Sequence, residues 1–473
     1  MTFSGARGTA RWCGTVLAVL VVGLALAPGR GATATRGREL WVARYNGPGD
    51  GDDVAKSLSV SADGSRVFVT GYSDGGLSHE DYATAAYAAS SGQLLWARRY
   101  TGPGSREDIA FSVGTSPQGS AVFVTGSSDR GDPNDVDYAT LAYDAVTGAT
   151  RWVRLYSGPG GGPDRALSLA ASPDGSQVFV TGSSYRWPAS TDYTTIAYAS
   201  GTGSVSWMTR YDGPVGGADT AYSVAASPDG SKVFVTGISD GGTSDYDAAT
   251  AAYSASTGVQ LWAGRYNGPG NDLDEALAVA ASPDGSMVFV TGDSIGVLTG
   301  VDYATVAYDS SSGTELWVSR YAGPGNGFDA AYSVAVSPDG SKVFVTGGSD
   351  ATNGLDDWAT VAHDAATGAT LWIKRYNGPL NGIDTAYSVA VSPDGSRVFV
   401  TGFSCGKAAD YTTVAYNAAT GATEWVRRYD GGQQDDAANF VAASADGSKV
   451  FVTGGSSRRI GNEDYVTLAY GTG

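Results

Sequence analysis

The chain has 473 residues, a formal net charge of −18 and 42% apolar residues, with 68 Gly, 27 Tyr, 11 Trp and only 2 Cys. Glycine is about twice as frequent as in average proteins, but it follows no Gly-X-Y period and is accompanied by many valine and aromatic residues, which excludes a collagenous or disordered chain. The acidic charge excludes nucleic acid and anionic lipid as partners, because both would be repelled.

Residues 1–34 differ in kind from the rest of the chain. Arg7 and Arg11 precede an apolar run from Val16 to Ala27, and Ala32-Thr33-Ala34 follows it. This order is typical of a secretory signal peptide, so we expect a secreted, extracellular protein that begins directly after this segment. The apolar run is too short to cross a bilayer, and no later run reaches the 18 or more apolar residues that a span needs. We therefore predict no membrane span.

The two cysteines indicate that the exported chain has no disulfide. Cys13 lies before the apolar run, not at its end where a lipoprotein cysteine would lie, and it is removed with the signal peptide. Cys405 then remains alone, so no intramolecular disulfide can form even in an oxidising compartment. Loss of the three arginines of the signal peptide takes the net charge to −21. Stability must come from packing alone.

A repeat governs the remaining residues, 35–473. Eight tryptophans recur at intervals of 53 to 56 residues, each followed by a tyrosine four positions later: Trp41, Trp96, Trp152, Trp207, Trp262, Trp317, Trp372 and Trp425. So regular a period is the signature of a repeat architecture. The 439 residues after the signal peptide amount to almost eight periods, which leaves no room for another domain.

Within one period, four short segments have strand character and are separated by turn residues. They are 329–337, 343–346, 357–363 and 371–376. The first alternates small and bulky residues with period two. Pro338-Asp339-Gly340 forms a tight turn, since proline presets its backbone angle and glycine supplies a positive φ. Each period therefore predicts a four-stranded antiparallel meander, with a variable loop between its second and third strands.

Eight such units predict an all-β, eight-bladed β-propeller, in which each blade buries its faces against its neighbours. A linear solenoid is the alternative. The ends of the repeat region favour the ring, because 39–45 reads as a lone fourth strand and 464–470 as a lone third strand. Pairing these two segments would complete the last blade and remove an exposed sheet edge.

One turn motif resembles a known family. Ala142-Tyr-Asp144-Ala-Val-Thr147-Gly148-Ala-Thr-Arg-Trp152 resembles the tryptophan-docking motif of quinoprotein-like (PQQ-like) propellers, and 307–317 and 362–372 match it equally well. The rest of the period, with Gly-Pro-Gly, Ser-x-Asp-Gly and Val-Phe-Val-Thr-Gly, looks like the bacterial secreted β-propeller repeat family. The resemblance implies that the eight tryptophans are structural and pack between blades.

The same resemblance argues against a bound quinone. Quinone enzymes of that fold typically use adjacent cysteines, a stacking tryptophan and calcium-ligating carboxylates at the centre of one face. This chain has no cysteine pair. We therefore expect no cofactor, with Ca²⁺ as the one ion to consider.

Other candidate catalytic groups lack the context that their chemistry needs. Residues 71–75 and 237–241 match the G-x-S-x-G pattern of hydrolases, but the pattern ends a strand here and has no helix after it. His79 is expected in a solvated loop and His363 in a packed strand. Two histidines cannot form a three-histidine zinc site. Cys405 is expected to be a loop thiol. We predict no catalytic residue.

Two series of aspartates recur once per repeat. The first opens the innermost strand: Asp53, Asp108, Asp164, Asp219, Asp274, Asp329, Asp384 and Asp436. A ring of these carboxylates near the axis could bind Ca²⁺, which takes six to eight oxygen ligands. The alternative is that each caps a turn. The second series opens the third strand: Asp81, Asp137, Asp192, Asp247, Asp302, Asp357, Asp410 and Asp464. Arginine precedes the closing tyrosine in every repeat except at Leu155, so Arg–Asp pairs are expected.

The eight loops after the second strands differ from blade to blade, whereas the turns on the other face are nearly uniform. They are 72–80, 127–136, 183–191, 238–246, 293–301, 348–356, 403–409 and 455–463. Loops can vary without disturbing the core, so specificity is expected on this face. Tyr185, Arg186 and Trp187 are the outlier, because these types are enriched at binding hot spots. The alternative is a loop folded over its own blade.

These observations favour a secreted, non-enzymatic binding or scaffold protein. Residues that repeat eight times form the scaffold, and no catalytic constellation breaks that symmetry. The expected partner is a protein or a glycan bound through the variable-loop face by a monomeric propeller. The alternative is a quinoprotein-like dehydrogenase or another propeller enzyme, which would need unique polar residues that converge on the axis.

Overall fold

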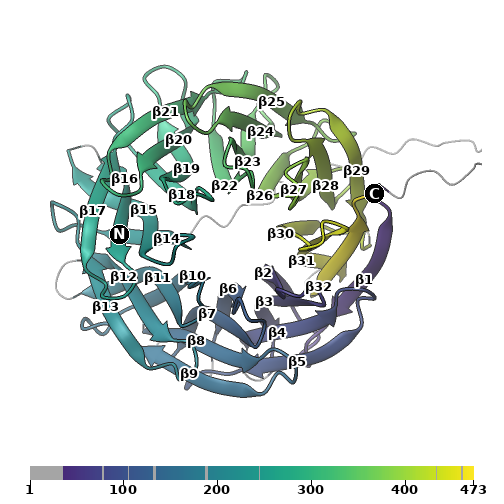
Figure 1. Cartoon of the computed structure of the whole chain (residues 1–473). Helices are drawn as coiled ribbons and strands as arrows, with labels where there is room; N and C mark the ends of the chain where they lie inside the picture. The colour runs from purple at the N-terminus through teal and green to yellow at the C-terminus, as the bar shows by residue number, and fades with distance from the viewer. Residues whose placement is uncertain are drawn as a thin grey trace, which may run out of the picture.

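The computed structural model describes residues 36–76, 79–104, 106–131, 135–186, 190–243, 245–432, 434–459 and 462–473. These residues form eight four-stranded antiparallel sheets arranged around a central axis (Figure 1). The predicted all-β, eight-bladed propeller is confirmed. Among the described residues there is no helix with the length and apolar character to cross a membrane.

Each blade contributes one strand to each of four concentric positions. The innermost strands are β2 (Asp53–Val60), β6 (Ile109–Thr115), β10 (Asp164–Ala171), β14 (Asp219–Ala226), β18 (Asp274–Ala281), β22 (Asp329–Val336), β26 (Asp384–Val391) and β30 (Asp436–Ala443). The second strands are β3 (Arg66–Asp74), β7 (Ala121–Asp129), β11 (Gln177–Arg186), β15 (Lys232–Gly242), β19 (Met287–Ile295), β23 (Lys342–Asp350), β27 (Arg397–Cys405) and β31 (Lys449–Arg459).

The two outer positions complete the blades. The third strands are β4 (Glu80–Ala88), β8 (Val136–Asp144), β12 (Ser190–Ala199), β16 (Asp245–Ser254), β20 (Val301–Asp309), β24 (Asp356–Asp364), β28 (Ala409–Asn417) and β32 (Asn462–Gly471). The outermost strands are β5 (Leu94–Tyr100), β9 (Thr150–Tyr156), β13 (Val205–Tyr211), β17 (Gln260–Tyr266), β21 (Glu315–Tyr321), β25 (Thr370–Tyr376), β29 (Thr423–Tyr429) and β1 (Glu39–Tyr45). Blades 1 to 7 run in chain order from β2–β5 to β26–β29, and blade 8 combines β30–β32 with β1.

Strand β1 closes the ring, as the sequence predicted. It pairs antiparallel with β32 from Glu39 opposite Tyr470 to Tyr45 opposite Tyr465, and Figure 1 shows it in purple beside the yellow β32. The turn between third and fourth strands, which is continuous in the other blades, is here assembled from residues 36–38 and 471–472. The amide of Gly37 donates to the carbonyl of Gly471 at 2.7 Å.

The recurring tryptophans hold neighbouring blades together. The indole N–H of Trp96 donates to the carbonyl of Ala145 in the next blade at 3.2 Å. Gly148 of the same turn lies against the indole at φ 70°, and a Cβ there would come within 2.6 Å of the ring. A side chain would clash and would also strain the backbone, so this position requires glycine. Gly37 takes the equivalent place against Trp425, so the split turn reproduces the continuous ones.

A β-bulge interrupts every innermost strand near its start. In blade 1, Ala55 lies opposite Gly71 and Ser57 opposite Thr70, which leaves Lys56 without a partner in the ladder. The repeated glycine of the second strand permits this bulge, because a Cβ on Gly71 would lie 1.9 Å from the Val54 carbonyl oxygen. The bulges recur in all eight blades.

The second strands extend further than the sequence predicted. In blade 6 the expected strand 343–346 is part of β23, which continues to Asp350 and pairs it with Asp356 of β24. The predicted variable loops were therefore too long at both ends. Antiparallel pairing uses backbone groups, so it continues through positions whose side chains differ between blades.

Candidate functional site

The two faces of the ring differ in their turn chemistry. On one face the first-to-second turns are nearly identical, and Asp339 shows their geometry: its carboxylate accepts hydrogen bonds from Ser337 Oγ at 2.5 Å and from the Ser341 amide at 3.0 Å. The other face carries the variable hairpins and the connections between blades. We call it the loop-bearing face.

The first aspartate series caps the connections between blades. In every blade the carboxylate accepts a hydrogen bond of 2.5 to 2.8 Å from the amide of a glycine five or six residues earlier, as Asp53 does from Gly47. Burial raises the pKa of Asp53, Asp108 and Asp436 to about 6. Among the described residues, no three of these eight carboxylates lie close enough together to hold a metal ion.

The second series forms the Arg–Asp pairs that the sequence indicated but could not match by number. Seven arginines of the outermost strands each contact the aspartate that opens the third strand of their own blade, at 2.7 to 3.1 Å: Arg99–Asp81, Arg210–Asp192, Arg265–Asp247, Arg320–Asp302, Arg375–Asp357, Arg428–Asp410 and Arg44–Asp464. Each arginine also donates to the hydroxyl of a second-strand serine, as Arg265 does to Ser239. These aspartates are therefore part of a structural network.

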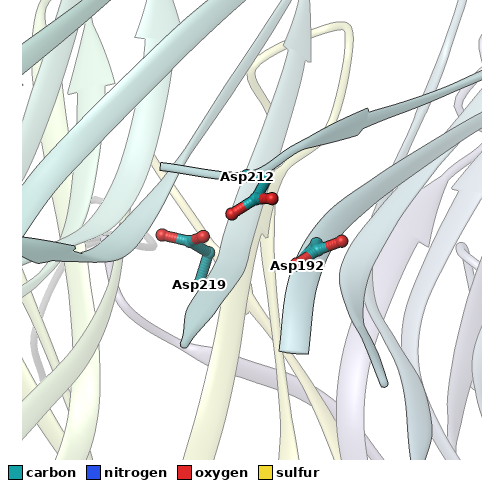
Figure 2. A group of neighbouring side chains, drawn as sticks. All are labelled: Asp192, Asp212 and Asp219. Atoms are coloured by element: carbon teal, nitrogen blue, oxygen red, sulfur yellow. The ribbon is translucent and has the colours of Figure 1, made fainter. Parts of the chain in front are cut away.

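Two groups of three aspartates lie where blades meet on the loop-bearing face. Figure 2 shows Asp192, Asp212 and Asp219, which each offer one carboxylate oxygen within 4.8 Å of the others. Asp410, Asp430 and Asp436 are arranged alike.

Arginine already compensates charge in the first group. Arg210 contacts Asp192 at 3.0 Å, and Arg186 contacts Asp212 at 3.2 Å. Carboxylate ligands of this kind suit a hard cation. Because arginines already contact two of the three carboxylates, the group does not by itself indicate a bound cation.

Of Tyr185, Arg186 and Trp187, the predicted binding hot spot, the two residues that the structure describes do not share one environment. Tyr185 lies near the end of β11 and packs over Gly162 of the connection into its own blade, where a Cβ would come within 2.5 Å of the ring. Arg186 is exposed and contacts Asp212. Trp187 lies outside the described residues. Tyr185 therefore packs on its own blade, whereas Arg186 stays exposed beside Asp212 in the connection to the next blade.

The remaining singled-out residues form no common site. His79 is exposed on the loop-bearing face, whereas His363 is 3% exposed in β24 and packs against Trp317 with 6.1 Å between ring centres. Burial lowers the pKa of His363 to about 4. Cys405 was expected in a loop, but it is a buried residue at the end of β27, because pairing with Ala409 extends that strand.

The structure reveals a set of variable positions that loop-based reasoning missed. We call them the axial belt. In each blade it consists of the residue after the capping aspartate, the second-strand residue that pairs with that residue, and the bulge residue. The first column is Val54, Ile109, Arg165, Thr220, Glu275, Ala330, Thr385 and Ala437. The bulge column is Lys56, Phe111, Leu167, Tyr222, Leu277, Tyr332, Tyr387 and Asn439. The opposite column is Tyr72, Ser127, Ser183, Ile238, Asp293, Gly348, Phe403 and Gly455.

Belt residues of neighbouring blades contact one another around the axis. The rings of Tyr332 and Tyr387 lie 5.9 Å apart, and Tyr387 lies 5.8 Å from Phe403. The amide of Asn439 donates to the Ala55 carbonyl across the closing junction at 2.7 Å. All these belt side chains are half-buried. The belt therefore follows the starts of the innermost strands, which surround the axis (Figure 1), and the paired residues of the second strands.

A cavity opens at the belt beside blades 2 and 3. Its volume is about 940 Å³, and its lining includes the belt residues Ile109, Phe111 and Arg165 together with His79 and Arg106 of the loop-bearing face. Arg106, Arg165 and His79 are exposed. This side of the axial mouth therefore combines Arg106 and Arg165 with the aromatic ring of Phe111, and the carboxylates of Glu107 and Asp129 also line it.

The belt of blade 5 is acidic. Glu275 and Asp293 are register partners on β18 and β19. Burial, reinforced by the neighbouring Glu275 carboxylate, raises the pKa of Asp293 to about 8, and burial also raises the pKa of Glu275. The axial mouth therefore has exposed arginines beside blades 2 and 3, aromatic rings in several blades and a carboxylate pair that occurs in blade 5 alone among the described belt positions.

A signal for the belt was present in the sequence. The opposite column contains the first residue of each predicted variable loop. The prediction therefore attributed the variation at these positions to loops, although they belong to the second strands. Alignment of the eight repeats would have identified the three columns. The residue type varies in them, whereas the adjacent position, Ala276 in blade 5, is alanine in every repeat.

Comparison with known proteins agrees with the fold and the repeat type. The sequence profile of the family described as outer membrane protein assembly factor BamB matches residues 302–462. No curated protein sequence matches the chain.

Among solved structures, BamB from Moraxella catarrhalis is 17% identical, covers 91% of this chain and 99% of its own, and has a TM-score of 0.51. Sqt1 from Chaetomium thermophilum, solved bound to the N-terminus of the ribosomal protein L10, is 12% identical with coverages of 92% and 100% and a TM-score of 0.57.

Quinohemoprotein alcohol dehydrogenase from Comamonas testosteroni is also similar. It is 12% identical, covers 92% of this chain and 76% of its own, and has a TM-score of 0.55. At these identities the likeness concerns the fold. The chain is thus an eight-bladed propeller that is similar to the BamB family over residues 302–462.

Proposed function

We propose that this chain is an exported, non-enzymatic binding propeller that holds a polypeptide segment at the axial mouth of its loop-bearing face. The observation that carries the proposal is the axial belt. In an architecture that otherwise repeats eight times, the belt positions change residue type from blade to blade and border a cavity of about 940 Å³.

The chemistry of the mouth favours a polypeptide over a glycan. Arg106 and Arg165 lie in a cavity that also contains the acids Glu107 and Asp129, apart from the carboxylates of Glu275 and Asp293, and aromatic rings lie between the two places around the axis. A polypeptide segment offers both signs of charge and apolar side chains, whereas a neutral glycan uses no opposed charges. Among proteins of similar fold, Sqt1 was solved with the N-terminus of another protein bound.

An enzymatic role is the second candidate, because the quinohemoprotein dehydrogenase shares the fold. The two cysteines are Cys13 and Cys405, so an adjacent pair is absent from the sequence. The belt holds unique polar groups, but in the described part of the chain no hydrogen bond joins its serine hydroxyls, those of Ser127 and Ser183, to a histidine or a carboxylate. Dye reduction that depends on added pyrroloquinoline quinone and Ca²⁺ would favour the dehydrogenase instead.

The test is a peptide selection followed by mutation of the mouth. Residues 35–473 are immobilised and exposed to a displayed library of random 12-residue peptides, and enriched peptides are synthesised and titrated by calorimetry. We expect Phe111→Ala and Arg165→Ala to weaken binding at least tenfold, because both residues line the cavity. Lys232→Ala, at the start of β15 on the uniform face, is the control and should leave binding unchanged.

Equal binding by all three variants would exclude the mouth as the binding site. Failure to enrich any peptide, together with binding on a glycan array, would favour a glycan. Export is tested separately by N-terminal sequencing of protein recovered from the medium of a secreting host. A sequence that begins near Thr35 is expected, whereas intact Met1 in the cell fraction would contradict export.

A further inference from the structure

Among the described residues, the carboxylates of Glu275 and Asp293 differ from both aspartate series in having neither an arginine nor a glycine amide as a compensating group. The first aspartate series accepts hydrogen bonds from glycine amides, and all eight members of the second series contact an arginine. In the described part of the chain, no lysine, arginine or histidine forms an ion pair with Glu275 or Asp293. The charged groups that act on Asp293 are Glu275 and Asp274, which are both acids.

This arrangement disfavours the folded chain at neutral pH. Asp293 is only 5% exposed, and its register partner Glu275 is half-buried. Two carboxyl groups held together in a buried place cannot both ionise without repulsion and loss of hydration, so keeping one of them protonated at neutral pH costs stability. The other seven blades have neutral or basic residues at both positions, so the fold does not require the acids. Groups that cost stability without a structural need are characteristic of binding sites.

Aromatic rings flank the pair on both sides. Tyr222 and Tyr332 are the bulge residues of β14 and β22, the innermost strands next to β18. Both carboxylates contribute to raising the pKa of each tyrosine, which places both phenols in their electrostatic range. Tyr332 continues into the ring contacts with Tyr387. A cation placed beside these rings would gain from their faces as well as from the carboxylates.

We propose that Glu275 and Asp293, between Tyr222 and Tyr332, form the subsite that receives a primary ammonium group of the bound segment, either a lysine side chain or a free amino terminus. This inference rests on the proposed function. An ammonium group donates three hydrogen bonds from one atom, so it can satisfy two carboxylates that come from neighbouring strands.

Binding at this subsite releases a proton. Without a ligand, Asp293 is mostly protonated at neutral pH; when the ammonium binds, the carboxyl proton leaves to solvent and the resulting carboxylate faces the cation. The titratable groups around Asp293 are Glu275 and Asp274 on β18, Tyr222 on β14 and Tyr332 on β22. Affinity should therefore rise with pH by roughly tenfold from 6.5 to 7.5, in proportion to the ionised fraction of Asp293.

The test uses small probes and isosteric variants. The probes are acetyl-lysine amide, which has the side-chain ammonium alone, triglycine amide, which has the amino terminus alone, and acetyl-norleucine amide, which has no charge. Binding to residues 35–473 is followed by calorimetry or ligand-observed NMR. We expect one or both ammonium probes to bind, the norleucine probe not to bind, and the double variant Glu275→Gln/Asp293→Asn to bind at least tenfold more weakly.

Glu315→Gln is the matched control, because it removes one acid from β21, the outermost strand of the same blade. It should bind the ammonium probes like the unmodified chain. The double variant should melt at an equal or higher temperature, since it relieves the repulsion, so weaker binding cannot be attributed to unfolding.

Equal binding of the norleucine probe, or unchanged binding by the double variant, would overturn the ammonium subsite. The proposed function fails in a different way. If selected peptides bind at Arg165 and Phe111 but are insensitive to Glu275→Gln/Asp293→Asn, the mouth binds polypeptide and only the subsite is wrong. If the library yields no peptide while the ammonium probes bind as expected, the subsite stands and the polypeptide assignment is wrong.

Discussion

Arg130 lies with its Nε 3.0 Å from the Asp137 carboxylate, in the one blade whose outermost strand has a leucine, Leu155, in place of the recurring arginine. The guanidinium comes from the hairpin between β7 and β8 instead of from β9. Asp137 is 1% exposed at its side chain, and burial raises its pKa to about 6 although Arg130 opposes that shift. The missing arginine of the repeat is thus replaced from a different segment.

This replacement predicts a second-site rescue. Arg130→Ala should lower the free energy of unfolding by about 1–3 kcal/mol, between the values for exposed and buried pairs, because the guanidinium is 45% exposed while its partner is buried. Adding Leu155→Arg should restore most of the loss by supplying the arginine used in the other blades. Chemical denaturation of the two variants measures both effects. No recovery in the double variant would contradict the equivalence.

Closure of the ring predicts a large effect for strand β1. Trp41→Ala should cost about 3–5 kcal/mol, since it removes the indole that packs against Gly92 and donates to the Ala89 carbonyl at 3.0 Å. Leu40→Ala, one residue earlier but 42% exposed, should cost less than about 1 kcal/mol. Thermal unfolding of both variants gives the comparison. Similar melting temperatures for the two would argue against closure through β1.

His363 predicts a defined pH dependence of stability. The folded chain keeps this imidazole neutral down to about pH 4, whereas the unfolded chain takes up a proton below about pH 6.5. Stability should therefore fall as the pH drops from 6.5 to 4, by up to about 3 kcal/mol.

His363→Tyr should remove this loss, because tyrosine occupies the equivalent position in other blades, for example Tyr308. Melting temperatures at pH 7.5 and 5 test it, with the exposed His79→Gln as control. A constant difference between the His363→Tyr variant and the unmodified chain at both pH values would refute the assignment.

The aspartate groups predict a weak response to calcium. The first aspartate series is occupied by glycine amides, and Arg210 and Arg186 compensate the group around Asp212. We therefore expect 1 mM Ca²⁺ to change the melting temperature by less than about 1 °C. A site with a dissociation constant of about 10 μM would add roughly 2.7 kcal/mol and raise it by a few degrees. Such a rise, lost in Asp212→Asn, would establish a calcium site instead.

The fold was largely predictable because its determinants recur along the chain. The spacing of Trp41 to Trp425 gave the number of blades, and the unpaired strand segments at the two ends gave the closure. Strand ends were less predictable: β23 continues to Asp350 through backbone pairing that the side-chain pattern does not encode.

The candidate site was predicted poorly for two physical reasons. The pairing of Glu275 with Asp293 depends on the register of β18 against β19, and that register shifts at the bulge between Ala276 and Ala278. A bulge leaves little trace in a sequence. The replacement of the missing arginine by Arg130 depends on how one hairpin folds back, which no repeat comparison reveals. Variation within strands was therefore mistaken for variation in loops.

The turn assembled from Gly37 and Gly471 has a consequence for chain topology. It is one of eight similar turns, and the residues at its two ends already touch, since a Cβ on Gly473 would lie 2.2 Å from Arg36 Cγ. A circular permutant that joins Gly473 to Arg36 through a short linker and opens the chain within the turn before Gly258 should fold into the same ring. Any outermost strand could then be the first strand of the chain. Ring closure requires the turn and the tryptophan that packs on it, and these occur in every blade.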